Sequence, residues 1–446
     1  MKYFFIGIAG AGMSAIAQYL AGKGHTVEGS DRVFLKPEGQ DSKQKLEAEG
    51  IICHAQGETT PALDTDFVVV STAIEDTVHE YKFAKDNGIK TIHRSDLLAD
   101  ICDHNRTIAV SGTSGKSTTT AMIYSVLEYC GFSPSLITGA GLCILQEQGK
   151  IGNAAVGKSD ILVIETDESD GTIVKYHPEI GLVLNINRDH KEIPELIPLF
   201  ETFCQHTRKT VIVNLDNEHS RQLTRNHGHD FSAKSECENF AQTMEGIRFT
   251  TSGTEFKLSQ IGRHNMENAL AAIQVARIFG INDNKISEAL SKYTGIYRRN
   301  RILASKNGIT LMDDFAHNPA KISASVSACQ DISNRVIAWF QPHGFAPSRL
   351  MKDELIADLS RLMRPQDIIV FSQIYYAGGT ADQSISAREF AEGLSANGKN
   401  AIYIEDRASL LPYLKSTAQS GDIILLMGAR DPSLVSFAEN IREGMF

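Results

Sequence analysis

The stretch AVSGTSGKSTTTAM, residues 109–122, decides the fold of the central part of this chain. The apolar residues before its glycines are typical of a strand, and apolar positions at helical spacing follow them. Gly-Lys-Ser at positions 115–117 stands where the turn becomes the helix. Successive backbone amides at such a helix start can hold the oxygens of a phosphate group. The stretch therefore predicts a phosphate-binding loop between a buried strand and a helix.

This loop departs by one position from the general nucleotide-binding pattern G-x-x-x-x-G-K-[ST]. The pattern would place its first glycine at Val110, whereas the chain has Gly112, three residues before Gly115. The order of strand, glycine turn and helix is nevertheless intact. Lys116 can neutralise the terminal phosphates of a nucleotide, and Ser117 can ligate Mg²⁺. The alternative, a Gly-Lys-Ser sequence without a ligand, fits this flanking context less well.

Length and composition limit the class of protein. The 446 residues are too many for one ordinary core, so two or three domains are expected. The net charge of −10 argues against nucleic acid as a partner, and the 7 scattered cysteines favour reduced thiols over disulfides or structural zinc. No apolar run reaches the roughly 18 residues of a membrane span. We predict a cytoplasmic protein without membrane insertion, either a monomer or a homodimer.

Strand-like and helix-like segments alternate along the chain, which is typical of parallel sheets covered by helices on both faces. Three such runs predict three domains, residues 1–104, 105–296 and 297–446. The helix NMENALAAIQVARIFG is expected to end at Gly280, and polar residues 225–245 are expected to form a loop and an edge strand. The predicted fold class is α/β with mostly parallel sheets.

A second glycine turn, GIAGAG at residues 7–12, follows the first strand. A dinucleotide-binding turn would need a glycine where this chain has Ala9. Gly10 and Gly12 can still let the backbone approach a pyrophosphate at the helix start. Asp31, near the end of the next strand, could accept a hydrogen bond from a ribose hydroxyl. The turn fits a bound nucleotide, tight packing without a ligand, or the cofactor site of an NAD-dependent oxidoreductase.

Acidic residues follow an apolar strand in ETDESD, residues 165–170. Such a run is usually a solvated loop. At the carboxyl edge of a parallel sheet beside a phosphate loop, however, carboxylates lie where Mg²⁺ must be held. Asp189 and His190 end the next strand and are expected at the same edge, although without Glu165 they would be weak evidence for a metal site.

Seven stretches, in order and spacing, make the chain similar to the Mur ligase family of ATP-dependent cell-wall ligases: GIAGAGMSAIA, SGTSGKSTTT, ETDESD, NINRDH, GRHNMENALAA, GIYRRNR and DDFAHNP. The resemblance runs from residue 3 to about residue 349, and the remaining sheet agrees in pattern. It implies a Rossmann-like N-terminal domain for a UDP-sugar, a central ATP-binding domain like those of phosphate-loop ATPases, and a Rossmann-like C-terminal ligase domain.

The resemblance also implies a reaction in peptidoglycan precursor synthesis. ATP would phosphorylate the carboxylate of UDP-N-acetylmuramate, and an incoming amine would attack the acyl phosphate and expel phosphate. Amide synthesis in water needs this activation because phosphate leaves more easily than hydroxide, while positioning and metal ions stabilise the developing charge. The glycine turn and the phosphate loop are most similar to those of the alanine-adding members, which makes L-alanine the leading amine.

The family's residue roles are carried over to the matching positions of this chain. ATP would be bound by Gly112, Thr113, Ser114, Gly115, Lys116, Ser117, Thr118, Asn265, Asn268, Arg299 (or its neighbour Arg298) and Asp314. The UDP-sugar would be bound by Gly10, Ala11, Gly12, Met13, Ser14, Asp31 and Ser71. Mg²⁺ would be held by Ser117, Glu165 and His190. The catalytic residues would be Lys116, Glu165, His190 and His317. The amine substrate would contact His343 and Arg349.

Two departures leave the amine open. The alanine-adding members have arginines, associated with the carboxylate of the amino acid or product, where this chain has Gly344 and Pro347. Neither residue can form a charge-assisted pair with a carboxylate, and only Arg349 remains. Phe315 replaces a commoner tyrosine, so that DDFAH is similar to the recycling ligase, which attaches a muramyl peptide to UDP-N-acetylmuramate. A nucleotide-dependent switch that makes no product is the non-enzyme alternative.

Overall fold

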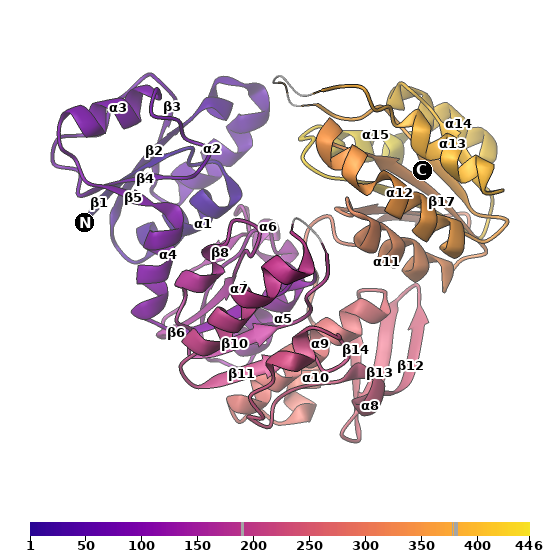
Figure 1. The fold of residues 1–446 in the computed structure, drawn as a ribbon, viewed down its shortest axis with the longest axis horizontal. Coiled ribbons are helices and arrows are strands. Elements are labelled where there is room, and N and C mark those ends of the chain that lie inside the picture. The colour runs from indigo at the N-terminus through magenta and orange to yellow at the C-terminus, as the bar shows by residue number, and fades with distance from the viewer. Residues whose placement is uncertain (189–190, 377, 379–381) are drawn as a thin grey trace. The chain divides into compact units, whose positions relative to one another are not determined.

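The structure, a computed structural model, describes residues 1–188, 191–376, 378 and 382–446. The chain forms two compact units, and Figure 1 identifies their elements by label and colour. The first unit comprises Met1–Asn239, Phe249–Lys257 and Asn265–Tyr297, and the second comprises Phe240–Arg248, Leu258–His264 and Arg298–Phe446. The predicted fold class, α/β with mostly parallel sheets, is confirmed. The predicted domain boundaries remain predictions.

A five-stranded parallel sheet opens the first unit, in the order β3-β2-β1-β4-β5. Its elements are β1 (Lys2–Ile6), β2 (Thr26–Asp31), β3 (Ile52–Ala55), β4 (Phe67–Val70), β5 (Thr91–His93), α1 (Ala11–Gly22), α2 (Gln40–Ala48), α3 (His79–Asp86) and α4 (Arg94–Asp103). Alternate β1 residues enter different cores, Phe4 with Ala84 of α3 and Phe5 with Ile16 of α1. The strand order reverses between β1 and β4, so the loops after these strands lie at the topological switch point, where open α/β sheets bind ligands.

A six-stranded sheet follows in the first unit, in the order β11-β10-β6-β9-β7-β8, with only β8 antiparallel to its neighbour. Its strands are β6 (Arg106–Ser111), β7 (Ser135–Ile137), β8 (Ala154–Ala155), β9 (Ile161–Glu165), β10 (Ile180–Val183) and β11 (Thr210–Val213). The helices of this region are α5 (Lys116–Tyr129), α6 (Cys143–Glu147), α7 (Ile193–His206), α8 (Ala233–Glu236), α9 (Arg263–Ile278) and α10 (Asp283–Ser291). Because β9 and β10 flank β6 in parallel, the loops after all three leave the same edge.

The polar stretch 225–245 contains a short helix, α8, in addition to the expected edge strand. That strand is β12 (Glu238–Thr243), at one edge of a three-stranded sheet with β13 (Gly246–Thr251) and β14 (Thr254–Leu258). Ser232 caps α8 because its side chain accepts a hydrogen bond from the Ser235 amide. The predicted stop after α9 is confirmed, since Gly280 has a left-handed φ of 73°.

The second unit is built on a six-stranded sheet in the order β15-β16-β20-β17-β18-β19, in which only the edge strand β15 is antiparallel. Its strands are β15 (Arg301–Lys306), β16 (Ile309–Asp314), β17 (Arg335–Gln341), β18 (Ile368–Phe371), β19 (Asn400–Tyr403) and β20 (Asp422–Gly428). Its helices are α11 (Pro319–Gln330), α12 (Phe345–Leu362), α13 (Arg388–Ala396), α14 (Leu410–Thr417) and α15 (Leu434–Met445). The last strand, β20, therefore lies between β16 and β17.

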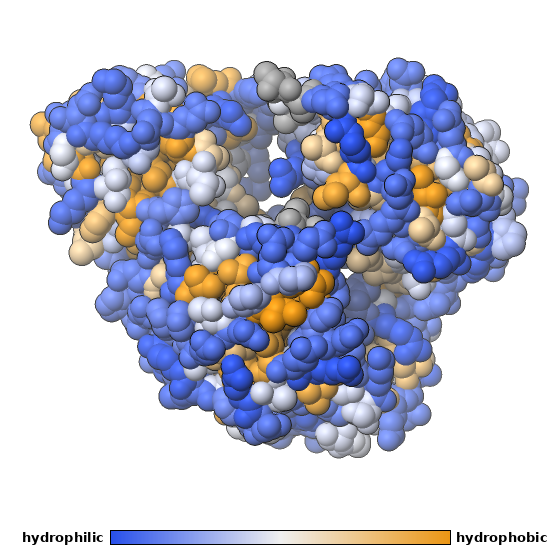
Figure 2. Space-filling view, in the orientation of Figure 1, coloured by the Kyte–Doolittle hydropathy of each residue, from blue (hydrophilic) through white to orange (hydrophobic). Residues whose placement is uncertain are grey.

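Two apolar cores cover the two faces of this sheet. Met312 of β16 packs with α11, α12 and α13, whereas its neighbour Leu311 packs with α14 and α15. Such burial on both faces explains why these strands are continuous apolar runs. Much of the visible surface is hydrophilic in Figure 2, with apolar residues showing between the polar ones. Within the described residues, no helix is both long enough and apolar enough to span a membrane.

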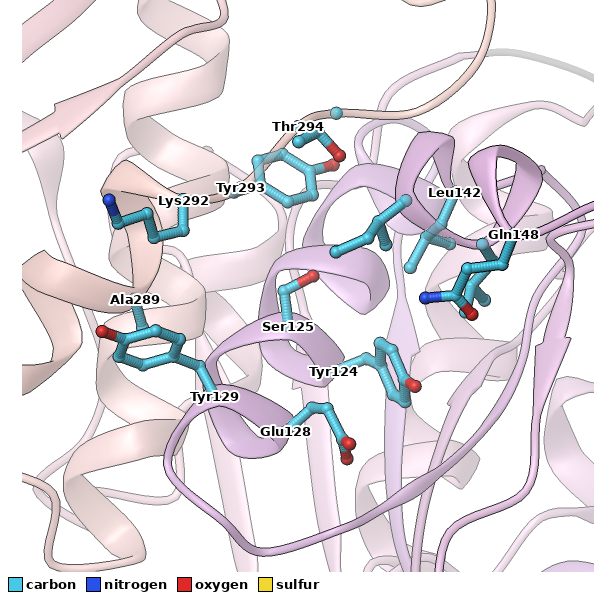
Figure 3. Close-up of a pocket in the computed structure, with 13 residues that line it drawn as sticks. Tyr124, Ser125, Glu128, Tyr129, Leu142, Gln148, Ala289, Lys292, Tyr293 and Thr294 are labelled. Atoms are coloured by element: carbon cyan, nitrogen blue, oxygen red, sulfur yellow. The ribbon is translucent and has the colours of Figure 1, made fainter.

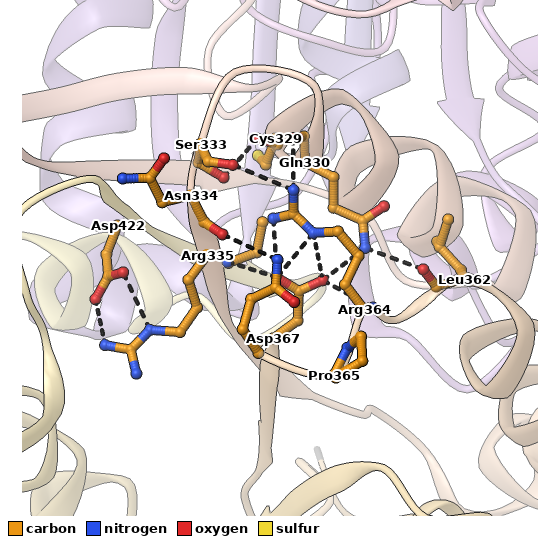
Figure 4. Close-up of polar contacts among 12 residues, drawn as sticks. Cys329, Gln330, Ser333, Asn334, Arg335, Leu362, Arg364, Pro365, Asp367 and Asp422 are labelled. Carbon is orange, nitrogen blue, oxygen red and sulfur yellow. Dashed lines mark hydrogen bonds and ion pairs between the residues drawn. The ribbon is translucent and has the colours of Figure 1, made fainter.

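Ion pairs fix the amino-terminal edge of the same sheet (Figure 4). Arg335, at the start of β17, donates from Nε to Asp422 Oδ1 at the start of β20 over 3.0 Å. Asp367 accepts from the Val336 amide over 2.9 Å and pairs with Arg364 over 3.0 Å. Charge-assisted bonds of this kind hold the strand starts in register.

Candidate functional site

The phosphate loop lies between β6 and α5 and contains two glycines with positive φ. Gly112 has φ 137° and Gly115 has φ 84°, conformations that side chains with a Cβ rarely adopt. A Cβ on Gly115 would also lie 2.4 Å from Asn268 Oδ1 of α9, so a larger residue would have to displace that side chain. The glycine at this position is therefore required by both the turn and its neighbour.

Asn185, which follows β10, holds the loop in shape. Its Oδ1 accepts from Thr113 Oγ1 over 2.9 Å and from the Ser114 amide over 2.8 Å, while its Nδ2 donates to the Ser114 carbonyl over 3.0 Å. No role was predicted for this asparagine, although it is the first residue of the stretch NINRDH. Its position at the carboxyl end of a strand beside β6 is the second signal.

Lys116 forms an ion pair with Glu168 of the acidic stretch, with Nζ 2.7 Å from Oε2. The exposed fractions of the two side chains are 14% and 4%. Burial lowers the pKa of Lys116, but the carboxylates of Glu168, Glu165 and Asp167 outweigh it, and the net shift is upward. Burial also raises the pKa of the Glu168 carboxyl. The lysine thus stays charged at the loop, beside a carboxylate that a phosphate could replace.

Glu165, at the end of β9, makes three hydrogen bonds at the same edge. Its Oε1 accepts from Ser117 Oγ over 2.9 Å, and its Oε2 accepts from Thr138 Oγ1 over 2.8 Å and from the Gly139 amide over 3.0 Å. The structure thus brings together two of the three predicted metal ligands. The third, His190, lies outside the described residues. Among the residues described, no group of three or more histidines, cysteines, aspartates and glutamates could hold a metal ion.

The two asparagines predicted to contact adenine lie together on α9. Asn268 Oδ1 accepts from Thr119 Oγ1 of α5 over 3.2 Å, and its Nδ2 donates to Asn265 Oδ1 over 3.3 Å. Both side chains are buried next to the start of α5. Their contact with adenine remains a prediction, and the observed hydrogen bond of Asn268 joins α9 to α5.

The N-terminal glycine turn is tightly packed. Gly10 precedes α1 as its N-cap, and a Cβ on Gly12 would lie 2.3 Å from Arg94 Nη1. Asp31 accepts from the Ala9 and Val33 amides, each over 2.9 Å, so both of its oxygens already bind backbone. Of the other predicted UDP-sugar contacts, Ala11, Met13 and Ser14 lie in the first turns of α1, and Ser71 directly follows β4. The predicted residues thus gather at the switch point, together with Arg94, which the motif analysis missed.

Second-unit residues predicted to act on ATP lie around the end of β16. Asp314 accepts from the Asn300 amide over 2.7 Å and from the Ala316 amide over 2.6 Å. Arg298 donates to Asp313 over 2.9 Å and to the Gly428 carbonyl over 3.0 Å. Because the Arg298 guanidinium is already bound to these groups, Arg299 is the better candidate of the two for a phosphate ligand.

The predicted amine-binding residues lie after β17. The rings of His343 and His317 have centroids 5.6 Å apart. Gly344 has φ 69° and is the N-cap of α12, and Pro347 lies in the first turn of that helix. Arg349 pairs with Asp382 over 2.8 Å and donates to Ser384 Oγ over 2.9 Å, so its guanidinium already has partners.

The lowered pKa of His317 predicts that the stability of the folded protein depends on pH. Burial, with the nearby charge of Lys321, lowers its pKa from 6.5 to about 3. Below about pH 6.5 the imidazole of the unfolded chain therefore binds a proton, whereas that of the folded protein stays neutral. The free energy of unfolding consequently falls as pH drops, by up to about 1.4 kcal/mol per pH unit. Between about pH 7 and about pH 5, the free energy of unfolding of His317→Gln should fall by up to about 2 kcal/mol less than that of the natural protein. Urea unfolding at the two pH values measures this difference. Identical pH profiles would contradict this.

The first unit also contains a cavity of about 280 Å³ that the motifs did not indicate (Figure 3). It is lined by the second half of α5, including Tyr124 and Tyr129, by Leu142, and by Tyr293 after α10. The phosphate loop precedes the opposite end of α5. The cavity is therefore separate from the loop, and none of the predicted site residues lines it.

Comparisons with known proteins agree with this geometry. Three domain models match the chain: "Mur ligase family, catalytic domain" at residues 2–106, "Mur ligase middle domain" at residues 110–276 and "Mur ligase, glutamate ligase domain" at residues 298–430. A UDP-N-acetylmuramate–L-alanine ligase of Pelotomaculum thermopropionicum is 34% identical over 96% of this chain and 94% of its own length. One of Syntrophomonas wolfei is 32% identical over 96% and 94%.

Solved structures are similar over the whole chain as well. The UDP-N-acetylmuramate–alanine ligase of Thermotoga maritima superposes with a TM-score of 0.79 at 25% identity, covering 99% of this chain and 98% of that one. A murein peptide ligase of Psychrobacter arcticus superposes with a TM-score of 0.66 at 20% identity, covering 100% and 98%. The second similarity shows a shared fold.

Proposed function

Because this chain belongs to the Mur ligase family and is an ATP-dependent ligase, we propose that it joins L-alanine to the carboxylate of UDP-N-acetylmuramate. The observation that carries the choice of substrates is the 34% identity, spread over 96% of the chain, to a relative of that name. Family membership decides against the NAD-dependent oxidoreductase. We place the reaction in the cytoplasm, where UDP-sugars and ATP are found.

The proposed reaction has two steps. A carboxylate oxygen of the UDP-sugar attacks the γ-phosphorus of ATP, and ADP leaves. The amine nitrogen then attacks the acyl carbon, loses a proton and expels phosphate. In the first step charge develops on the transferring phosphoryl group, and Lys116 is placed at the phosphate loop to stabilise it. For Lys116 to do so, the phosphates must compete with Glu168 for its ammonium group.

The residues at this edge fit a magnesium ion. Mg²⁺ prefers oxygen ligands and is usually bound by one or two carboxylates together with waters and phosphate oxygens. Glu165 offers a carboxylate and Ser117 a hydroxyl, with Oε1 and Oγ 2.9 Å apart. We propose that these two residues hold Mg²⁺ with His190 as a further ligand. Bound there, the ion would neutralise charge on the phosphate oxygens.

The remaining roles follow the family's motifs. We propose that Asn265 and Asn268 contact adenine, that Asp314 binds the ribose, and that Arg299 binds the phosphates of ATP. We propose that His317 approaches the transferring phosphate as a neutral imidazole. Its Nδ1 lies 2.7 Å from the Phe315 carbonyl, which fixes the tautomer with Nε2 as acceptor.

For the UDP-sugar we propose the switch point of the first sheet. The start of α1 offers the free amides and positive dipole that favour a diphosphate. Arg94 adds a guanidinium group beside Gly12, where a Cβ would lie 2.3 Å from its Nη1. We propose that the diphosphate lies against this helix start.

A competition experiment is expected to identify the amine. Purified protein is mixed with UDP-N-acetylmuramate, ATP and Mg²⁺, and with equal concentrations of L-alanine, glycine, L-serine and a muramyl-type tripeptide. We expect the mass of the product to be that of the L-alanine adduct, with one phosphate released per amide formed. Preference for the tripeptide would instead assign the recycling reaction. Phe315, and the absence of arginines at Gly344 and Pro347, favour that alternative. Absence of any amide product would refute the UDP-sugar assignment.

A further inference from the structure

Arg430 adopts an unusual backbone conformation directly after β20. Its φ is 64°, in the left-handed region that residues with a Cβ rarely occupy. A glycine would adopt this conformation without strain, so the turn by itself does not require an arginine at this position. Strained residues of this kind persist when the surrounding structure holds them, and they cluster at functional sites.

The surrounding turn is held at both ends. The Gly428 carbonyl accepts from Arg298 Nη2 over 3.0 Å, and Asp431 Oδ2 accepts from Arg407 Nη1 over 2.6 Å. The same Arg407 nitrogen donates to Gln341 Oε1, at the end of β17, over 2.9 Å. Asp431 is buried, whereas Arg430 is exposed. The turn is thus tied to the end of β17 and presents its single strained residue at the surface.

The sheet topology places Arg430 in the middle of the carboxyl-terminal edge. β20 lies between β16 and β17, with Met427 opposite Asp314 and Gly428 opposite Gln341. His317 follows the end of β16 and His343 follows the end of β17, with their rings 5.6 Å apart. Arg430 therefore leaves the sheet between the two strands whose ends lead to these histidines. The carboxyl edge is where open α/β sheets bind ligands.

The charges at this edge leave Arg430 available for a ligand. Arg298 and Arg407 are bound to Asp313 and Asp431, and Arg349 is bound to Asp382. Within the described part of the chain, the Arg430 guanidinium has no ion pair or hydrogen bond. Gly344 and Pro347 meanwhile offer no charge to a carboxylate. The edge thus lacks two expected arginines, and besides Arg299, which lies over the Phe315 ring, it carries an unpaired arginine at position 430.

We propose that Arg430 binds the α-carboxylate of the incoming amine, replacing the guanidinium groups that Gly344 and Pro347 cannot supply. A guanidinium can hold a carboxylate through two parallel hydrogen bonds, which would orient the amine nitrogen for attack. This assignment rests on the proposed ligase function. What it adds to that function is a specificity-determining residue, Arg430, which would select amines that carry a free carboxylate.

The test compares L-alanine with L-alaninamide, which lacks the carboxylate, as substrates of the natural protein, Arg430→Gln and Arg430→Lys. Loss of a hydrogen-bonded charge is expected to raise the KM for L-alanine about ten- to a hundredfold in Arg430→Gln. The KM for ATP and the rate with L-alaninamide should stay unchanged. The preference for L-alanine over L-alaninamide should therefore fall by the same factor, and Arg430→Lys should restore part of it.

Two controls separate this role from a structural one. Arg430→Gly relieves the strain, so it should retain or raise Tm while losing the preference for L-alanine. Arg361→Gln removes an exposed arginine of α12 that pairs with Asp358, and it should leave the preference intact. An unchanged preference in Arg430→Gln, with amide still formed, would overturn the role of Arg430 alone. No amide from the natural protein with any amine would overturn the proposed function and this inference together.

Discussion

Lys116→Ala is expected to abolish ATP-dependent phosphate release, lowering kcat by at least about a hundredfold. The ammonium group lies at the start of α5, directly after the phosphate loop, and no other lysine lies in that loop. In the proposed role this charge acts when the phosphoryl group is transferred, so its loss should lower kcat more than the affinity for ATP. Phosphate release with UDP-N-acetylmuramate and an amine measures this directly. Turnover near the natural rate in a folded variant would refute the role of Lys116.

The partner of Lys116 provides the matched control. In Lys116→Ala the buried Glu168 loses its cation, and breaking such a pair costs about 3–5 kcal/mol. Lys116→Ala/Glu168→Gln removes both charges and should recover much of that stability without recovering activity. Glu168→Gln alone keeps the lysine and should retain far more activity than either variant. Urea unfolding and kinetics on the three proteins distinguish a lost catalytic charge from a damaged fold.

Glu165→Gln is expected to lower kcat by about a hundredfold or more and to raise the Mg²⁺ concentration needed for half-maximal rate. The substitution replaces the carboxylate of the proposed metal ligand with a neutral amide, which binds Mg²⁺ far more weakly. The amide would also place a donor where Oε1 or Oε2 now accepts from Ser117, Thr138 and Gly139. A Mg²⁺ titration of phosphate release at saturating ATP measures both effects.

Thr138→Val is the control for the loop around Glu165. It removes the 2.8 Å hydrogen bond to Oε2 but leaves the carboxylate in place. We therefore expect a smaller loss of kcat than in Glu165→Gln and little change in the Mg²⁺ requirement. Equal Mg²⁺ curves for Glu165→Gln and the natural protein would show that Glu165 shapes the loop without binding the metal.

Local patterns in the sequence were sufficient for the fold class and for the position of the phosphate loop, while the roles of the site residues remain proposals. Apolar runs and helical spacing are local properties, so the alternation of strands and helices is visible without any tertiary contact. Lys116 and Glu165 could be placed together because loops at the carboxyl ends of parallel strands share one edge. The pairing of β6 with β9 confirms that shared edge, with Val110 opposite Glu165.

Only the tertiary structure decided which partners those residues have. Glu168 pairs with Lys116 across 52 positions, and Asn185 binds Ser114 across 71 positions. No local pattern encodes such contacts, because they depend on which strands become neighbours. The position of β20 between β16 and β17 is of the same kind, and it alone brings Arg430 to the edge that holds His317 and His343.

The neighbouring arginines Arg298 and Arg299 show the same division. In the sequence they are equivalent candidates for a phosphate ligand, because both belong to the stretch GIYRRNR. In the fold, both guanidinium groups lie over the Phe315 ring, at 5.5 and 5.2 Å, but only Arg298 is also buried and bound to Asp313 and to the Gly428 carbonyl. The sequence by itself determined the fold class, the phosphate loop and the family. The tertiary structure decided which charges are already paired, because pairing depends on strand order and burial, which join residues far apart in the chain.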